Sequence, residues 1–222
     1  MTKVGLMGGS FNPVHRQHLA IARRVRAALG LDEVRLIPVF QPVHKPGEEM
    51  LPFGSRVELL RAAIGVERGL VVDDVEQRLS GLSYTIRTIR YLKEQNPYAQ
   101  FMLIIGSDSL HDLPNWRESE SLIREVPLCV CLRPGFPIRG PLPGTASVQV
   151  EIDESPVCSR RIRQSLSRGE FAGLELAAPV VARLVEQDSY GCLGEPHRSW
   201  VLRLQALIDE MDPGMREHIR SV

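Results

Sequence analysis

The 222-residue chain has no excess of charge of either sign, because 27 lysines and arginines balance 27 aspartates and glutamates. Without a net positive field the whole protein is not drawn to nucleic acid or to an anionic membrane, so any anion site has to be local. The sequence also lacks an apolar run approaching the ~20 residues that cross a bilayer, and no signal-peptide layout follows Met1. These absences predict a cytoplasmic protein without a nucleic-acid or membrane partner.

Cysteine is scarce, and internal repeats and low-complexity segments are missing. The four cysteines are Cys129, Cys131, Cys158 and Cys192. They form no CxxC pair, and none has a histidine at the spacing of a zinc site. Because free cysteine packs as a small hydrophobe, we expect buried, reduced thiols and no metal ion held by protein side chains alone.

Hydrophobic residues make up 43% of the chain and charged residues 24%, which is typical of a globular domain with one well-buried core. Short apolar runs predict strands at Lys3 to Met7, Val34 to Val39, Leu70 to Val72, Phe101 to Ile105, Leu128 to Leu132 and Val148 to Ile152. Between them, helical patterns are expected up to Gly30, from Ser55, over Thr85 to Gln95 and over Glu118 to Arg124. Ser55 and Glu58 have the spacing of a capping box. This alternation predicts a Rossmann-like α/β fold, in which helices cover both faces of a parallel sheet.

The segment over residues 194–222 differs in character, with a helical pattern from Trp200 to Met211 and a break at Asp212, Pro213 and Gly214. We therefore expect one domain over residues 1–193 and a separate helical extension over residues 194–222. The final MREHIRSV, with His218, resembles the opening of a metal-dependent phosphohydrolase domain. A solvated C-terminal helix is the alternative.

The run GGSFNPVHRQH, from Gly8 to His18, lies directly between the first strand and the first long helix. Its glycines allow close approach of the backbone to a phosphate, and a helix start offers unpaired N–H groups and a positive dipole end. His15 and His18 are three apart, so on a helix they share one face near that end. The run is neither a Walker A loop nor a GxGxxG fingerprint, so it does not imply a bound redox dinucleotide.

A second cluster is SRRIR, where Ser159 is expected to cap a helix whose first turn carries Arg160, Arg161 and Arg163. Cations at a helix amino terminus oppose the helix dipole unless an anion binds there. The pattern therefore indicates either a polyphosphate site or a solvated basic turn.

These runs resemble a known family. GGSFNPVHRQH is similar to the GG-T/S-F-D/N-P-x-H-x-G-H signature of the nucleotidyltransferase superfamily that includes bacterial nicotinate-nucleotide adenylyltransferase. Gln17 replaces the usual glycine between the histidines. Residues 157–163 resemble its ISSTxIR motif, with Val157, Cys158 and Arg160 replacing Ile, Ser and Thr. The similarity extends from about Lys3 to Tyr190, and it implies a nucleotidyltransferase domain over residues 1–193.

The resemblance also implies which residues bind the substrates. The ATP site would comprise Gly8, Gly9, Ser10, Phe11, His15, His18, Gly106, Asp108, Ser159, Ile162 and Arg163. QPVHK is similar to the family's PPHK loop, SYT to its binding site for the nicotinate carboxylate, and the Trp of LPNWRE to its pyridine-stacking Trp. The mononucleotide site would comprise His44, Lys45, Ser83, Tyr84, Thr85, Trp116 and Arg133.

The reaction so implied is transfer of AMP from ATP to nicotinate mononucleotide, which gives nicotinate adenine dinucleotide and pyrophosphate in NAD biosynthesis. His15, His18, Lys45 and Arg163 are the candidate catalytic residues, because they can neutralise phosphate charge. Mg²⁺ is expected to enter with ATP. Other acceptors, nicotinamide mononucleotide or pantetheine phosphate, and a non-catalytic nucleotide-binding role stay open, and the sequence does not indicate an oligomeric state.

Overall fold

The computed structural model describes residues 1–43, 50–133, 135–144, 147–152, 155, 157–171 and 173–193. These residues form a six-stranded sheet in the order β3-β2-β1-β4-β5-β6, and every neighbouring pair is parallel. The strands are β1 (Lys3–Gly9), β2 (Glu33–Pro38), β3 (Leu70–Val72), β4 (Gln100–Gly106), β5 (Leu128–Cys131) and β6 (Val148–Val150). The parallel sheet confirms the predicted Rossmann-like α/β fold.

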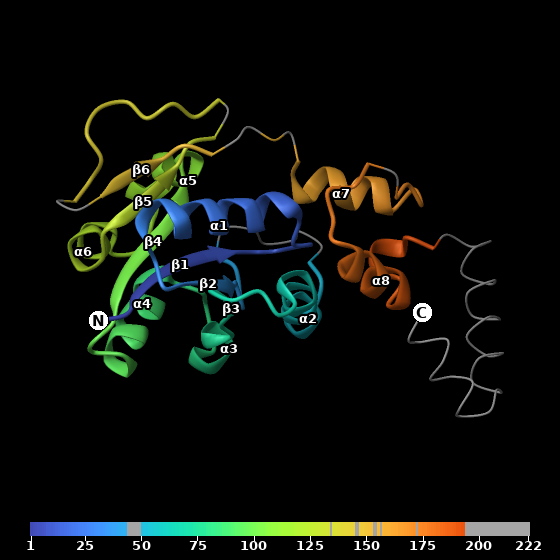
Figure 1. Cartoon of the computed structure of the whole chain (residues 1–222), viewed down its shortest axis with the longest axis horizontal. Coiled ribbons are helices and arrows are strands. Elements are labelled where there is room, and N and C mark those ends of the chain that lie inside the picture. The colour runs from blue at the N-terminus through green and yellow to red at the C-terminus, as the bar shows by residue number, and fades with distance from the viewer. Residues whose placement is uncertain are drawn as a thin grey trace.

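Helices cover both faces of this sheet (Figure 1). One face packs against α1 (Arg16–Leu29), α2 (Phe53–Ile64), α7 (Ser159–Leu166) and α8 (Ala178–Glu186). The other packs against α3 (Val75–Leu79), α4 (Thr85–Gln95), α5 (Ser107–Asp112), α6 (Ser119–Glu125) and the 3₁₀ turn η1 (Leu113–Asn115). A second 3₁₀ turn, η2 (Ser189–Gly191), follows α8. Side chains alternate between the two faces along each strand; in β5, for example, Cys129 and Cys131 face one cluster and Leu128 and Val130 the other.

Most expected elements are present, but two expected caps are wrong. Helix α2 begins at Phe53 with Pro52 in the cap position, so Ser55 lies inside the first turn and forms no capping box. Pro52 sets the extended backbone from which the helix starts, and its carbonyl accepts the N–H of Arg56 at 3.1 Å. Helix α7 begins at Ser159, so the capping position belongs to Cys158. The expected buried state of Cys158 is also wrong, because this thiol is exposed whereas the other three cysteines are buried.

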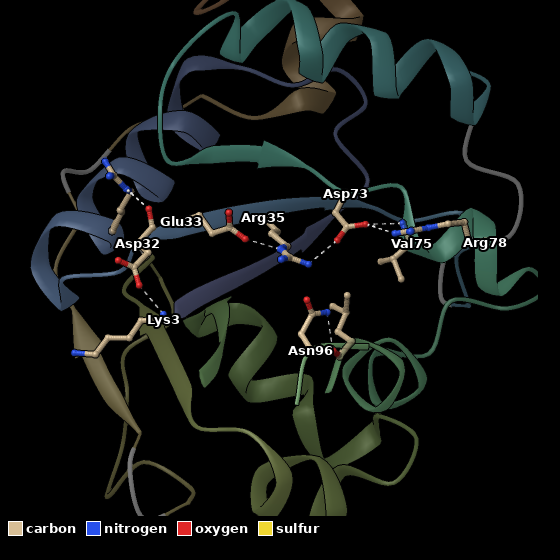
Figure 2. A network of polar contacts seen from close by, with 10 residues as sticks. Lys3, Asp32, Glu33, Arg35, Asp73, Val75, Arg78 and Asn96 are labelled. Atoms are coloured by element: carbon tan, nitrogen blue, oxygen red, sulfur yellow. Dashed lines mark hydrogen bonds and ion pairs between the residues drawn. The ribbon is translucent and has the colours of Figure 1, made fainter. Parts of the chain in front are cut away.

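Helix α3 is fixed by an ionic network beside β2 and β3 (Figure 2). One Asp73 carboxylate oxygen accepts the N–H of Val75 at 3.0 Å and an Arg78 nitrogen at 2.6 Å. The other accepts Nη1 of Arg35 at 3.2 Å, and Arg35 also bonds Glu33 at 2.7 Å. Asp73 therefore ties the first residue of α3 to the sheet, through a side chain that is only 9% exposed.

In the part of the chain that the structure describes, no helix is long and apolar enough to cross a membrane. The expected extension over residues 194–222, with Trp200 to Met211 and His218, lies outside the described residues. The proposed division of the chain at residue 193 stays a prediction.

Candidate functional site

The candidate site lies at the carboxyl edge of the central strands. Parallel neighbours β1, β4 and β5 end at Gly9, Gly106 and Cys131, so the segments that follow them meet at one edge of the sheet. In Figure 1, β1 runs toward the end of the molecule where α2, α7 and α8 gather. The turn between β1 and α1, residues 9–15, is the centre of this edge, and we call it the β1–α1 turn.

The β1–α1 turn is folded around the ring of Phe11. Phe11 has a left-handed backbone (φ 45°) and is 1% exposed, and its ring lies against Gly9. A Cβ at Gly9 would approach this ring to 3.1 Å, so glycine is needed here for close packing. The Phe11 ring also meets the His18 ring edge-on at 5.0 Å between centroids. The Phe11 ring therefore packs against both the turn and His18 and supports their positions.

His15 and His18 lie together at the start of α1. His15 is the N-cap residue with an extended backbone, and the two ring centroids are 3.8 Å apart. The backbone N–H of His15 donates to Nδ1 of His18 at 3.2 Å. A neutral His18 that accepts at Nδ1 must carry its proton on Nε2, so its Nε2–H is the donor that a ligand can use.

Both imidazoles are neutral at physiological pH. Burial, with a smaller contribution from the positive charge of Arg133, lowers the pKa of His15 to about 4. Burial followed by the charges of His15 and Arg133 lowers the pKa of His18 well below its usual value. The site thus offers neutral N–H donors and the start of a helix, rather than two fixed cations.

Helix α7 contacts the β1–α1 turn directly. Oγ of Ser159 donates to the carbonyl of Pro13 at 3.0 Å, and Nη1 of Arg163 donates to the carbonyl of Asn12 at 2.7 Å. The expectation that Ser159 caps its own helix is wrong because this hydroxyl bonds to the turn instead. The two motifs singled out in the sequence therefore face each other, as a shared polyphosphate site requires.

The remaining residues of the SRRIR cluster differ in exposure. Arg160 and Arg161 are exposed, whereas the Ile162 side chain is 3% exposed and packs in the core. The N–H of Ile162 donates to the carbonyl of Cys158 at 3.2 Å, so it is used within the helix. Of these residues, Ser159 and Arg163 are the ones that reach the β1–α1 turn.

A third contribution comes from the ends of β4 and β5. Arg133 contacts the Asp108 carboxylate at 3.2 Å, and its backbone N–H donates to Oγ of Ser107 at 2.9 Å. Gly106 lies under this pair, because a Cβ there would come within 2.8 Å of Nε of Arg133. The positive charge of Arg133 also adds to the effect of burial in lowering the pKa of both histidines. Gly106, Asp108 and Arg133 thus join the same site.

The predicted acceptor residues lie at the start of α4. Ser83 precedes the helix, Tyr84 is its N-cap residue and Thr85 its first residue. Oγ of Ser83 accepts the N–H groups of Phe40 and Gln41, each at 3.0 Å, so its hydroxyl joins α4 to the segment after β2. This placement makes Ser83 a residue that orients the helix start.

Trp116 is half-buried beside the same helix. Its Nε1–H donates to Asp112 at 3.2 Å, and its ring packs against the hydrophobic cluster that Tyr84 also contacts. The guanidinium of Arg117 lies 4.6 Å from the centre of the Tyr84 ring. Trp116 and Tyr84 therefore lie on the same side of the sheet. Two predicted residues, His44 and Lys45, lie outside the described residues.

Three functional candidates were missed in the sequence, namely Arg56, Glu76 and Tyr190. Tyr190, in η2, donates its hydroxyl to Oδ1 of Asn12 at 2.6 Å, which is the same oxygen that accepts the N–H of Leu51 at 3.1 Å. Nothing local in the sequence pairs residue 190 with residue 12. The tyrosine connects the last described turn of the chain to the β1–α1 turn.

Tyr190→Phe should lower the free energy of unfolding by about 1 kcal/mol, because the ring stays while one hydrogen bond to Asn12 is lost. Urea unfolding of the variant beside wild type measures the loss. Tyr98→Phe is a matched control, since Tyr98 is 79% exposed and should leave stability unchanged. An equal loss in both variants would contradict the role of Tyr190.

Comparison with known proteins gives consistent results. A sequence profile for the family described as cytidylyltransferase-like matches residues 6–165. A curated protein of Gloeobacter violaceus, named probable nicotinate-nucleotide adenylyltransferase, is 39% identical over 188 residues, covering 80% of this chain and 89% of that protein. A protein of the same name from Streptococcus pneumoniae is 34% identical over 188 residues, covering 85% of this chain and 88% of its own length.

Among solved structures, the Plasmodium falciparum nicotinic acid mononucleotide adenylyltransferase complexed with NaAD superposes with a TM-score of 0.75. The identity is 17%, and the match covers 86% of this chain and 98% of that chain. At this identity the superposition supports the fold. The sequence matches carry the assignment to a family.

Proposed function

Because this chain belongs to the nicotinate-nucleotide adenylyltransferases of the cytidylyltransferase-like family, we propose that it transfers the AMP part of ATP to nicotinate mononucleotide. Membership of this family identifies the chain as a nucleotidyltransferase. The observation that carries the proposal is the meeting of the β1–α1 turn, with its two histidines, and the start of α7 at one edge of the sheet. That arrangement suits a polyphosphate bound by N–H donors and helix starts.

The reaction needs little from the protein beyond placement and charge stabilisation. An oxygen of the acceptor phosphate, already anionic at neutral pH, attacks the α-phosphorus of ATP. The bond from that phosphorus to the oxygen that bridges the α- and β-phosphates breaks. Pyrophosphate leaves, and nicotinate adenine dinucleotide forms. The Nε2–H of His18 is our candidate donor to the phosphate oxygens as charge develops, with His15, Lys45 and Arg163 as further candidates.

Mg²⁺ is proposed to enter with ATP. Among the described residues, no group of three or more His, Cys, Asp or Glu side chains is placed to hold a metal ion. Oδ1 of Asp108 is buried and has no hydrogen-bond partner within that same part of the chain. This donor set fits an ion held mainly by substrate phosphates, with Asp108 able to supply one protein oxygen. Bound there, Mg²⁺ would neutralise charge on the phosphates.

The function is tested by assaying the full chain with ATP, Mg²⁺ and three acceptors in parallel: nicotinate mononucleotide, nicotinamide mononucleotide and pantetheine phosphate. We expect pyrophosphate release and a dinucleotide of the expected mass with nicotinate mononucleotide. Higher activity with nicotinamide mononucleotide or with pantetheine phosphate would identify that compound as the preferred acceptor instead. No release with any acceptor, despite ATP binding, would favour a non-catalytic nucleotide-binding protein.

Trp116→Ala should raise KM for the mononucleotide by roughly tenfold or more and leave KM for ATP within about threefold, because loss of an aromatic stacking partner costs on the order of 1–3 kcal/mol per base. Steady-state kinetics with each substrate varied in turn measures the two constants. Tyr98→Ala is the matched control, because Tyr98 is an exposed aromatic residue. Equal rises in both constants would remove Trp116 from the acceptor pocket.

A further inference from the structure

Two oppositely charged side chains are buried behind the candidate site without an ion pair between them. Arg56, in α2, is 1% exposed and is among the largest fully buried side chains of the described residues. Glu76, in α3, is 8% exposed. Buried charges are costly unless hydrogen bonds satisfy them, so both positions call for a specific role.

Arg56 is held by main-chain carbonyls of two segments that border the site. Its Nη1 donates to the carbonyl of Ser10 at 2.9 Å, inside the β1–α1 turn. Its Nε donates to the carbonyl of Leu51 at 3.0 Å. No carboxylate lies within ion-pair distance of this guanidinium among the residues that the structure describes. A rigid, planar donor thus holds the main chain of the β1–α1 turn in place.

Glu76 makes the equivalent contacts at the acceptor side. One carboxylate oxygen accepts the N–H of Phe40 at 3.0 Å, and the other accepts the hydroxyl of Thr88 at 3.4 Å. Burial raises the pKa of the Glu76 carboxyl, while hydrogen bonds from Ser83, Phe40 and Thr88 and the charge of Arg56 act in the opposite direction. Glu76 therefore joins the end of β2 to both sides of the α4 start.

The two charges are linked by a chain of contacts. The Phe40 ring meets the Phe53 ring edge-on at 5.2 Å, and the guanidinium of Arg56 lies 5.5 Å from the centre of the Phe53 ring. Burial shifts the pKa of each group toward the neutral form, and the opposite charge of its counterpart acts against that shift. The link extends from Thr88 through Glu76, Phe40 and Phe53 to Arg56 and the carbonyl of Ser10.

We propose that Arg56 and Glu76 are positioning residues for different substrates: Arg56 shapes the β1–α1 turn for ATP, and Glu76 shapes the α4 start for the mononucleotide. This assignment rests on the proposed function. Both side chains are buried, so each acts through the main chain that it holds. Because Asp73 independently bonds Val75 of α3 and Arg35 of β2 (Figure 2), a change at Glu76 alters the α4 start without releasing α3 from the sheet.

The test compares Arg56→Met and Arg56→Lys with Glu76→Gln and Thr88→Val. We expect Arg56→Met to raise KM for ATP roughly tenfold, with KM for the mononucleotide within about threefold, because two buried carbonyls lose their donors. Arg56→Lys keeps the charge and one donor group and should restore part of the affinity for ATP. Glu76→Gln and Thr88→Val should show the reverse split, with the larger rise for the mononucleotide.

Matched controls are Arg61→Met on the exposed side of α2 and Glu94→Gln on the exposed side of α4, both of which should behave as wild type. Thermal unfolding of every variant separates a general loss of structure from a substrate-specific effect. If Arg56→Met does not fold, the KM values of Arg56→Lys for the two substrates test whether Arg56 controls ATP affinity. Equal rises for both substrates in each variant, a reversed split, or unchanged constants would overturn the proposal.

Binding is measured separately by calorimetry, with a non-hydrolysable ATP analogue and with nicotinate mononucleotide alone. We expect the Arg56 variants to raise Kd mainly for the ATP analogue, and the Glu76 and Thr88 variants to raise Kd mainly for nicotinate mononucleotide. If wild type makes no dinucleotide, the proposed function fails, yet the analogue titration still decides whether Arg56 controls ATP affinity. If wild type is active and the Kd values do not split, the positioning roles fail and the proposed function stands.

Discussion

His18→Ala should lower kcat about 10²- to 10³-fold, in line with the loss of one donor to developing charge at a reacting oxygen. In the neutral ring Nδ1 is already occupied by the N–H of His15, so Nε2–H is the group that the variant removes from the ligand side. The measurement is steady-state turnover with ATP and nicotinate mononucleotide. Turnover equal to wild type would exclude His18 from the chemistry.

His18→Asn separates chemistry from architecture. The amide oxygen of asparagine can take the place of Nδ1 and accept the N–H of His15, while nothing replaces Nε2–H. We expect the variant to keep wild-type thermal stability and still lose most of its turnover. His111→Ala is the matched control, because this exposed histidine bonds the Pro137 carbonyl away from the β1–α1 turn. Full activity in His18→Asn would show that His18 only supports the turn.

The protein should lose stability in mild acid because of the same histidines. His15 has a folded pKa of about 4 against a usual value of 6.5, so below pH 6.5 the unfolded chain takes up a proton that the folded chain refuses. The stabilisation is complete above pH 6.5 and is lost as the pH falls toward 4. His15 alone should remove about 2 kcal/mol from the free energy of unfolding between pH 7 and pH 4.5, and His18 acts in the same direction.

Urea unfolding at pH 7 and pH 4.5, for wild type and for His15→Gln, isolates this effect. The glutamine side chain does not titrate, so the variant should lose about 2 kcal/mol less than wild type over the same interval. Carboxylates titrate equally in both proteins and cancel in the difference. Identical losses in the two proteins would show that folding does not lower the pKa of His15.

The sheet and the site motifs could be predicted from sequence because their signals are local. Strands such as Phe101 to Ile105 are short apolar runs, and the glycine pair precedes a helix pattern directly. The meeting of α7 with the β1–α1 turn is implied by the family resemblance, which puts residues of both motifs in one ATP site. The structure supplies its contacts, which run from Ser159 and Arg163 to main-chain carbonyls.

Other parts could not be predicted from a pattern along the chain. Arg56 and Glu76 are charged residues in helices, a type almost never fully buried, and the groups that satisfy them are main-chain atoms from other segments. Helix α3 has five residues, too few for a periodic signal. The cap of α2 was misplaced because Pro52, three residues before Ser55, sets the helix start.

The β1–α1 turn is closed by partners that are made much later on the ribosome. Ser159, Arg163 and Tyr190 bond to it across sequence separations of 146, 151 and 178 residues. A nascent chain can pair β1 with β2 early, but the β1–α1 turn gains these three hydrogen bonds only after their partners have emerged. ATP binding should therefore develop late in synthesis. We expect a chain truncated before residue 190 to form the sheet and to bind ATP poorly, because it lacks the bond from Tyr190 to Asn12.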